Sequence, residues 1–268
     1  MEPKEKMTIP KLQSMKKEGK KITCLTAYDW LTASILDSAG IDLVLVGDSC
    51  SMVFTGHPTT LPITMDQMVY HTQAVSRGVQ RAVVISDMPF LSFQAGSEEA
   101  VRNAGRFLKE GQAHGVKVEG GEIIAETIRR LVQTGIPVMG HLGLTPQSIR
   151  LFGGYGVRGM EKTEADILQK DAKILEEAGV FSIVLEKIPA ELAKQITESV
   201  SVPTIGIGAG AHCDGQILVT ADMLGFFEAF KPKFVRQYEQ IAKRIRKAVG
   251  KYIEDVNSGE YPSKEESY

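Results

Sequence analysis

Short apolar segments alternate with helical segments along most of this chain, and this alternation constrains the fold more than any other feature. Each apolar segment has the length of a buried strand, and most are followed by a stretch with helical periodicity. Such alternation predicts a parallel sheet, because parallel neighbours need a long crossover connection. The eight strand candidates are residues 22–27, 43–46, 82–86, 116–119, 137–142, 182–185, 204–207 and 217–219.

A closed barrel of the α/β class, the (β/α)8 or TIM barrel, explains this pattern better than a doubly wound sheet. Charged residues follow several different strands, as they do at the active-site end of such barrels, whereas a doubly wound sheet gathers its site at one switch point. We therefore expect one barrel domain over residues 1–268, with an N-terminal helical extension and a short polar C-terminal tail. The helices are expected at residues 30–39, 65–76, 98–114, 123–133, 164–178, 190–199 and 234–256.

The strand candidate at residues 116–119 carries two charges. Lys117 and Glu119 are two residues apart and therefore point to the same face of a strand. Opposite charges directed inward make a poor core, because buried charges are costly unless they pair with each other, a metal or a substrate. Other apolar strands run into Asp48, Asp87 and Glu186. This repetition indicates an enzyme.

Three of these carboxylates are candidate metal ligands. Asp48, Asp87 and Glu119 are hard oxygen donors on three different strands, which suits Mg²⁺ or a similar divalent ion completed by water and substrate. Each one alone could equally be a helix cap or a loop carboxylate. That alternative is much weaker for all three together, and no zinc-type spacing is present.

The remaining polar residues at the strand ends have more than one interpretation. Lys117 is either a cation that binds substrate or a Schiff-base nucleophile, and a metal nearby favours binding. Glu186 ends an apolar strand, where a raised pKa suits a general base; its alternative is an ion pair with Lys187. His141 ends the fifth strand and either contacts substrate, supports a residue that does, or is a hydrogen-bonded core residue.

Composition and charge exclude several other classes of protein. The formal net charge is −2, which gives no basic footprint for nucleic acid. No apolar run approaches the roughly 20 residues of a membrane span, and the N-terminal segment lacks the apolar region of a signal peptide. The three cysteines show no pairing or zinc motif, so a cytoplasmic location is expected.

The glycine run at residues 206–210 fits either a phosphate-binding loop or a tight turn.

Six short motifs occur in a specific order at residues 26–29, 46–49, 87–90, 116–121, 140–148 and 205–210. In this combination the chain resembles the ketopantoate hydroxymethyltransferase family from about residue 8 to about residue 253. The resemblance implies a (β/α)8 barrel, usually decameric, that requires Mg²⁺. It also implies transfer of a hydroxymethyl group from 5,10-methylenetetrahydrofolate to 3-methyl-2-oxobutanoate (α-ketoisovalerate), which gives 2-dehydropantoate (ketopantoate) for pantothenate biosynthesis.

The resemblance also implies roles for single residues. Glu186 matches the proton acceptor of the family, and Lys187 departs from the small residue or cysteine expected beside it. The expected metal ligands, with Glu119 either bound directly or one shell further out, are Asp48, Asp87 and Glu119. The expected substrate-binding residues are Asp48, Ser49, Asp87, Lys117 and His141.

Two other functions are compatible with the same residues. One is a Mg²⁺-dependent carbon–carbon lyase of the phosphoenolpyruvate-binding barrel type, which would need no folate. The other is a barrel that binds a metabolite without turnover, although the complete set of charged residues argues against it. The fold alone does not distinguish among these functions.

Overall fold

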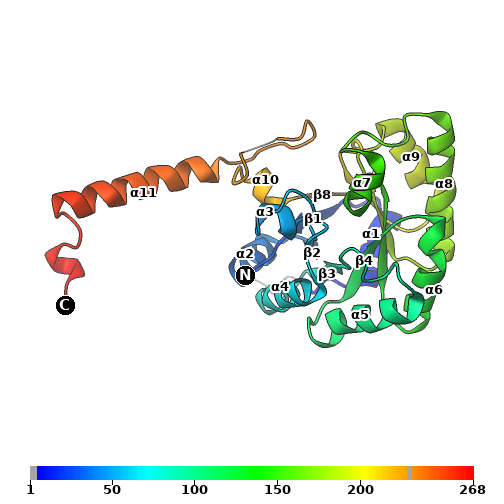
Figure 1. Ribbon diagram of the computed structural model, residues 1–268, viewed down its shortest axis with the longest axis horizontal. Helices are drawn as coiled ribbons and strands as arrows, with labels where there is room; N and C mark the ends of the chain where they lie inside the picture. The colour runs from blue at the N-terminus through cyan, green and yellow to red at the C-terminus, as the bar shows by residue number, and fades with distance from the viewer. Residues whose placement is uncertain (1–4, 229–230) are drawn as a thin grey trace. The chain divides into compact units, whose positions relative to one another are not determined.

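The computed structural model describes residues 5–228 and 231–268, and its strands close into a barrel (Figure 1). Every strand pairs in parallel with the next along the chain, and β8 returns to β1. The predicted (β/α)8 barrel is thereby confirmed. The strands are β1 Ile22–Thr26, β2 Leu43–Val46, β3 Val83–Asp87, β4 Gly115–Glu119, β5 Val138–Gly143, β6 Ser182–Glu186, β7 Thr204–Ile207 and β8 Gly215–Leu218.

In the unit that holds the barrel, residues 5–218, helices surround the strands and shorter helical turns lie in the loops (Figure 1). The longer helices are α1 Ile9–Lys17, α2 Trp30–Ala39, α4 Met65–Gly78, α5 Ser97–Lys109, α6 Ala125–Gln133, α8 Lys162–Glu177, α9 Ala190–Ser199 and α11 Ile241–Ser258. The short turns are α3 Cys50–Val53, η1 Glu122–Ile124, η2 Pro146–Ser148, α7 Ile149–Phe152, α10 Thr220–Met223 and η3 Lys264–Glu266. Helix α5 ends five residues earlier than the expected residue 114, and Gln112 just beyond it adopts the left-handed region with φ of 57°.

The core has an inner and an outer layer because side chains alternate along each strand. In β2, Leu43 and Leu45 join the apolar cluster inside the barrel, whereas Val44 and Val46 join the cluster between barrel and helices. All four are buried, as expected for a parallel strand covered on both faces. This explains why β2 reads as a continuous apolar run.

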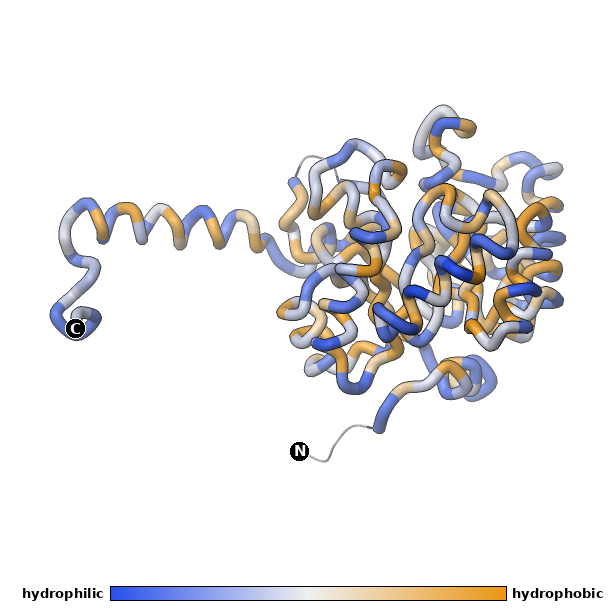
Figure 2. The backbone as a smooth tube through the Cα atoms, turned by 60° about the horizontal axis from the view of Figure 1, so that its bottom comes forward, coloured by the Kyte–Doolittle hydropathy of each residue, from blue (hydrophilic) through white to orange (hydrophobic). Residues whose placement is uncertain are grey.

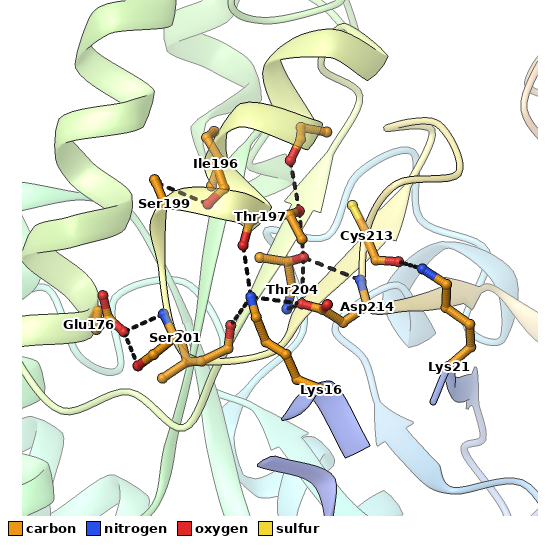
Figure 3. A network of polar contacts seen from close by, with 12 residues as sticks. Lys16, Lys21, Glu176, Ile196, Thr197, Ser199, Ser201, Thr204, Cys213 and Asp214 are labelled. Carbon is orange, nitrogen blue, oxygen red and sulfur yellow. Dashed lines mark hydrogen bonds and ion pairs between the residues drawn. The ribbon is translucent and has the colours of Figure 1, made fainter. Parts of the chain in front are cut away.

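Helix α1 packs against the N-terminal ends of the strands. Leu12 belongs to the cluster inside the barrel. The Lys16 Nζ donates to the carbonyl oxygens of Thr197 and Val202 at 2.8 and 3.0 Å and lies 3.0 Å from Oδ2 of Asp214 (Figure 3). The helix therefore closes the end of the barrel opposite to the charged strand ends.

Contacts divide the chain into two compact units, residues 1–218 with the barrel and residues 219–268 with α10, α11 and η3. A single domain over the whole chain stays a prediction.

Helix α11 was expected from residue 234 but begins at Ile241, because the N–H groups of Tyr238 and Ile241 donate to the carbonyls of Met223 and Leu224. Polar and apolar residues alternate along α11, and none is buried (Figure 2). Among the helices described, none has the length and apolar character to cross a bilayer.

Candidate active site

The charged residues singled out in the sequence gather at the C-terminal ends of neighbouring strands. Asp87 and Glu186 are the last residues of β3 and β6, and Asp48 lies two residues beyond the end of β2. The register of the parallel strands places Asp87 beside Lys117. The same register places Glu119 beside His141, so the closure of the barrel brings together residues that are far apart in the sequence.

The loop after β5 reaches this site through a glycine. Gly143 has φ of 91°, and a Cβ at this position would collide with the carbonyl oxygen of Glu186. Only glycine combines this conformation with such a close approach. The N–H of Leu144 then donates to the same Glu186 carbonyl at 2.8 Å. The chain is thereby directed into η2, which lies against the site.

Lys117 is a buried cation between acidic neighbours. Its Nζ lies 3.1 Å from Oδ1 of Asp87 and 3.1 Å from Nδ1 of His141. Desolvation by itself would lower the pKa of Lys117, but the charges of Asp87, Glu119 and Asp48 raise it above its ordinary value. The side chain is therefore an ammonium ion.

Asp48 and Asp87 form the acidic side of the site. The N–H of Asp48 donates to Oδ2 of Asp87 at 2.9 Å. Burial, followed by the charges of Asp87 and Glu119, raises the pKa of Asp48 well above its usual range. Burial also raises the pKa of Asp87, although Lys117 opposes this effect. Two buried acids with raised pKa values form a place where an added cation is favourable.

His141 lies between the two glutamates. Its Nδ1 is 3.4 Å from Oε1 of Glu119, and its Nε2 is 3.2 Å from Oε2 of Glu186. Desolvation and Lys117 lower the pKa of His141, but the two glutamates outweigh them and raise it to about 8. Burial opposes ionisation of Glu119, yet His141 and Lys117 hold the pKa of this glutamate below its ordinary value. Of the candidate carboxylates, Glu186 is the most accessible, with 17% of its side chain exposed against 4% for Glu119.

The structure adds two residues to which sequence reasoning gave no role. The buried Gln147 in η2 donates from Nε2 to Oδ2 of Asp48 at 2.9 Å. The hydroxyl of Tyr28 lies 2.8 Å from Oγ of Ser49, which directly follows Asp48 in the chain. Both residues belong to motifs that carry the family resemblance, and membership of those motifs was the only sequence signal for them.

The residues fit a divalent cation held partly by water and substrate. Oδ1 of Asp87 is buried 3.1 Å from Nζ of Lys117, and Oε1 of Glu119 is buried 3.4 Å from Nδ1 of His141. Neither oxygen accepts a well-aligned hydrogen bond from the described residues. Within that same part of the chain, no three His, Cys, Asp or Glu side chains converge tightly enough to hold a metal by themselves. Mg²⁺ commonly binds through one or two carboxylates and keeps several waters, so this donor set suits it.

The glycine run at residues 206–210 is explained by close packing. A Cβ on Gly206 would lie 3.0 Å from the sulfur of Cys213, and a Cβ on Gly210 would collide with Ala190. The side chain of Gln216 donates to the carbonyl of Gly210 at 2.9 Å. Close packing therefore accounts for Gly206 in β7 and for Gly210 in the loop after it.

Fold and site together define a (β/α)8-barrel enzyme, with buried carboxylates, a lysine and a histidine at the C-terminal strand ends. The chain belongs to the ketopantoate hydroxymethyltransferase family, whose model matches residues 6–264. The 3-methyl-2-oxobutanoate hydroxymethyltransferase of Prosthecochloris aestuarii is 58% identical over 266 residues, which cover 98% of this chain and 96% of that one. The protein of the same name from Syntrophus aciditrophicus is 55% identical over 263 residues, 98% of this chain and 97% of that one.

Two solved structures share the fold at low sequence identity. A 2,3-dimethylmalate lyase of the PEP mutase/isocitrate lyase superfamily aligns with a TM-score of 0.59 and 16% identity over 79% of this chain and 78% of that one. Phosphonopyruvate hydrolase in complex with oxalate and Mg²⁺ aligns with a TM-score of 0.60 and 14% identity over 97% of this chain and 93% of that one. At these identities the likeness concerns the barrel alone.

Proposed function

We propose that this protein transfers a hydroxymethyl group from 5,10-methylenetetrahydrofolate to 3-methyl-2-oxobutanoate and forms 2-dehydropantoate with the help of Mg²⁺ or a similar divalent ion. The observation that carries the proposal is the division of the site into two parts. A buried acidic part, Asp48 and Asp87, lies beside the ammonium of Lys117. A more accessible carboxylate, Glu186, is separated from it by His141.

Each residue has a definite task in this reaction. Asp48 and Asp87 would hold the cation, with Glu119 next to it; Lys117 would balance the carboxylate of the keto acid. Ser49, Asp48, Asp87 and His141 would complete the substrate contacts. A bound divalent cation supplies Lewis-acid polarisation of the keto-acid oxygens.

Glu186 would act as the general base. Its carboxylate takes the proton from C3 of the keto acid, and the electron pair left at C3 forms the new bond to the methylene carbon of the folate. Both bonds from that carbon to folate nitrogens break, and one water supplies the hydroxyl group. The proton taken from C3 and the second proton of the water pass to the two nitrogens, so that tetrahydrofolate and 2-dehydropantoate leave. His141 would hold Glu186 in position, since its Nε2 is 3.2 Å away. A positioned base of this kind typically contributes about 10²–10⁴-fold.

The rival functions have less support. Relatives above 50% identity over nearly the whole chain carry the transferase name, whereas the likeness to lyases rests on the barrel alone. A barrel that only binds a metabolite leaves the position of Glu186 unexplained.

We also propose, from the sequence resemblance, a cytoplasmic homo-oligomer of ten chains. Light scattering measures the number of chains directly.

Deuterium exchange at C3 tests the proposed reaction. The keto acid is incubated with the protein in D₂O with and without Mg²⁺ and followed by NMR, and methylenetetrahydrofolate is then added. The proposal expects Mg²⁺-dependent exchange followed by formation of 2-dehydropantoate. Exchange without product would favour the lyase, and absence of exchange with every divalent ion would favour a binding protein.

A further inference from the structure

We propose that Gln147 is a positioning residue that aligns Asp48 with Glu119 for the divalent cation. This inference rests on the proposed metal-dependent function. It concerns a residue that would touch neither metal nor substrate and would act through the carboxylates that it holds.

The polar atoms of Gln147 contact the ends of three strands. Its side-chain Nε2 donates to Oδ2 of Asp48 and to the carbonyl oxygen of Met88, both at 2.9 Å. Its backbone N–H donates to Oε2 of Glu119, also at 2.9 Å. Its Oε1 accepts from Nε2 of Gln94 at 3.0 Å. Both amide hydrogens and the amide oxygen are therefore used, and the orientation of the side chain is fixed.

These contacts leave one oxygen of Glu119 and its charge for another ligand. Oε2 of Glu119 is occupied by the backbone of Gln147, while Oε1 is buried 3.4 Å from Nδ1 of His141 and accepts no well-aligned hydrogen bond from the described residues. On Asp48, Gln147 holds Oδ2. An amide donor is neutral, so it fixes a carboxylate without cancelling the negative charge that attracts a cation. A lysine or arginine at this position would fix the carboxylates equally well but compete with the metal.

The contact with Met88 connects Gln147 to the end of strand β3. Met88 directly follows β3 and is completely buried, and its carbonyl accepts one of the two amide hydrogens. Asp87, its neighbour, is the second proposed ligand. Gln147 thus ties the loop after β5 to the residues that follow β2 and β3. Residues that orient metal ligands in this way typically change metal affinity or activity by about 10–100-fold when replaced.

Mn²⁺ binding to the full-length protein without substrate tests this role. The free Mn²⁺ is measured by electron paramagnetic resonance for wild type, Gln147→Met and Gln147→Asn. Methionine keeps the length without the donors, and asparagine keeps the amide without the reach to Asp48. We expect each variant to bind Mn²⁺ about 10–100-fold more weakly. The backbone N–H to Glu119 survives in both variants, so we expect C3 exchange to approach the wild-type rate at saturating Mn²⁺, which damage to the fold would prevent.

Gln169→Met is the matched control, because it removes the same kind of side-chain donor on α8, to Oε1 of Gln195, and touches none of the site residues. Its Mn²⁺ affinity should equal that of wild type. Unchanged affinity in Gln147→Asn or Gln147→Met, while Asp48→Asn abolishes binding, would overturn the positioning role alone. A wild-type protein that binds no Mn²⁺ would overturn the metal centre and this role together.

Discussion

The Nε2 atom of His141 lies 3.2 Å from Oε2 of Glu186, and this contact couples the candidate base to the acidic side of the site. The opposite ring nitrogen faces Oε1 of Glu119 at 3.4 Å. One imidazole therefore lies between Glu186, which is partly exposed, and Glu119, which is buried. These contacts place His141 among the other site residues, and its contact with substrate stays a prediction.

Replacing Glu186 by glutamine should remove proton abstraction. We expect C3 exchange in D₂O to fall about 10²–10⁴-fold, because the amide has nearly the same shape but cannot accept the proton. Binding of Mn²⁺ and of the keto acid, measured by calorimetry, should remain near that of wild type. Glu177→Gln, on an exposed position of α8, is the matched control. Exchange at the wild-type rate in Glu186→Gln would contradict the role of base.

Mg²⁺ should stabilise the protein more at pH 8 than at pH 5.5. The folded-state pKa values of Asp48 and Asp87 are raised, so their protonation contributes stability at low pH that is lost as pH rises through those values. His141 acts in the same direction, and its contribution is lost between its ordinary pKa of 6.5 and about 8. At pH 8 these groups have lost their protons, and a bound Mg²⁺ supplies positive charge in their place. The cation also binds more tightly because its carboxylate ligands are then ionised. Melting temperatures with Mg²⁺ and with a chelator, at both pH values, measure the difference. An equal rise in melting temperature with Mg²⁺ at both pH values would contradict this account.

Tyr28→Phe should weaken keto-acid binding without changing the chemical step. The hydroxyl of Tyr28 lies 2.8 Å from Oγ of Ser49, and a hydrogen bond of about 1 kcal/mol corresponds to roughly a fivefold change. We therefore expect KM for the keto acid to rise by about that factor, with kcat nearly unchanged. Tyr70→Phe is the control, since Tyr70 is 66% exposed. A fall in kcat at constant KM would instead assign the hydroxyl to the transition state.

Lys16→Met should destabilise the barrel from the end remote from the site. The variant loses two hydrogen bonds to carbonyl oxygens and leaves Asp214 without its cation. We expect the free energy of unfolding of the barrel unit to fall by about 2–3 kcal/mol in urea, with KM unchanged. Lys17→Met, which changes an exposed neighbour, should have almost no effect. Equal stability of the two variants would show that α1 is held by its apolar face alone.

The barrel could be predicted because its strands are buried on both faces and therefore read as continuous apolar runs. In β2, all four residues are apolar and all four are buried. The start of α11 was misplaced by seven residues, since hydrogen bonds from Tyr238 and Ile241 to Met223 and Leu224 replace those of a helix. Helical periodicity cannot reveal such partners, because they belong to a different segment of the chain.

The sequence by itself determined the alternation of strands and helices, and it determined which strands end in charge. Lys117 and Glu119 had to share a face because strand geometry has a period of two residues. Only the tertiary structure decided that Gln147 reaches Asp48, 99 residues away in the chain. It also decided that Lys117 lies beside Asp87 and that His141 lies between two glutamates. These pairings follow from the register and closure of the barrel, and the pKa values follow from burial, so both exist only once the strands have assembled.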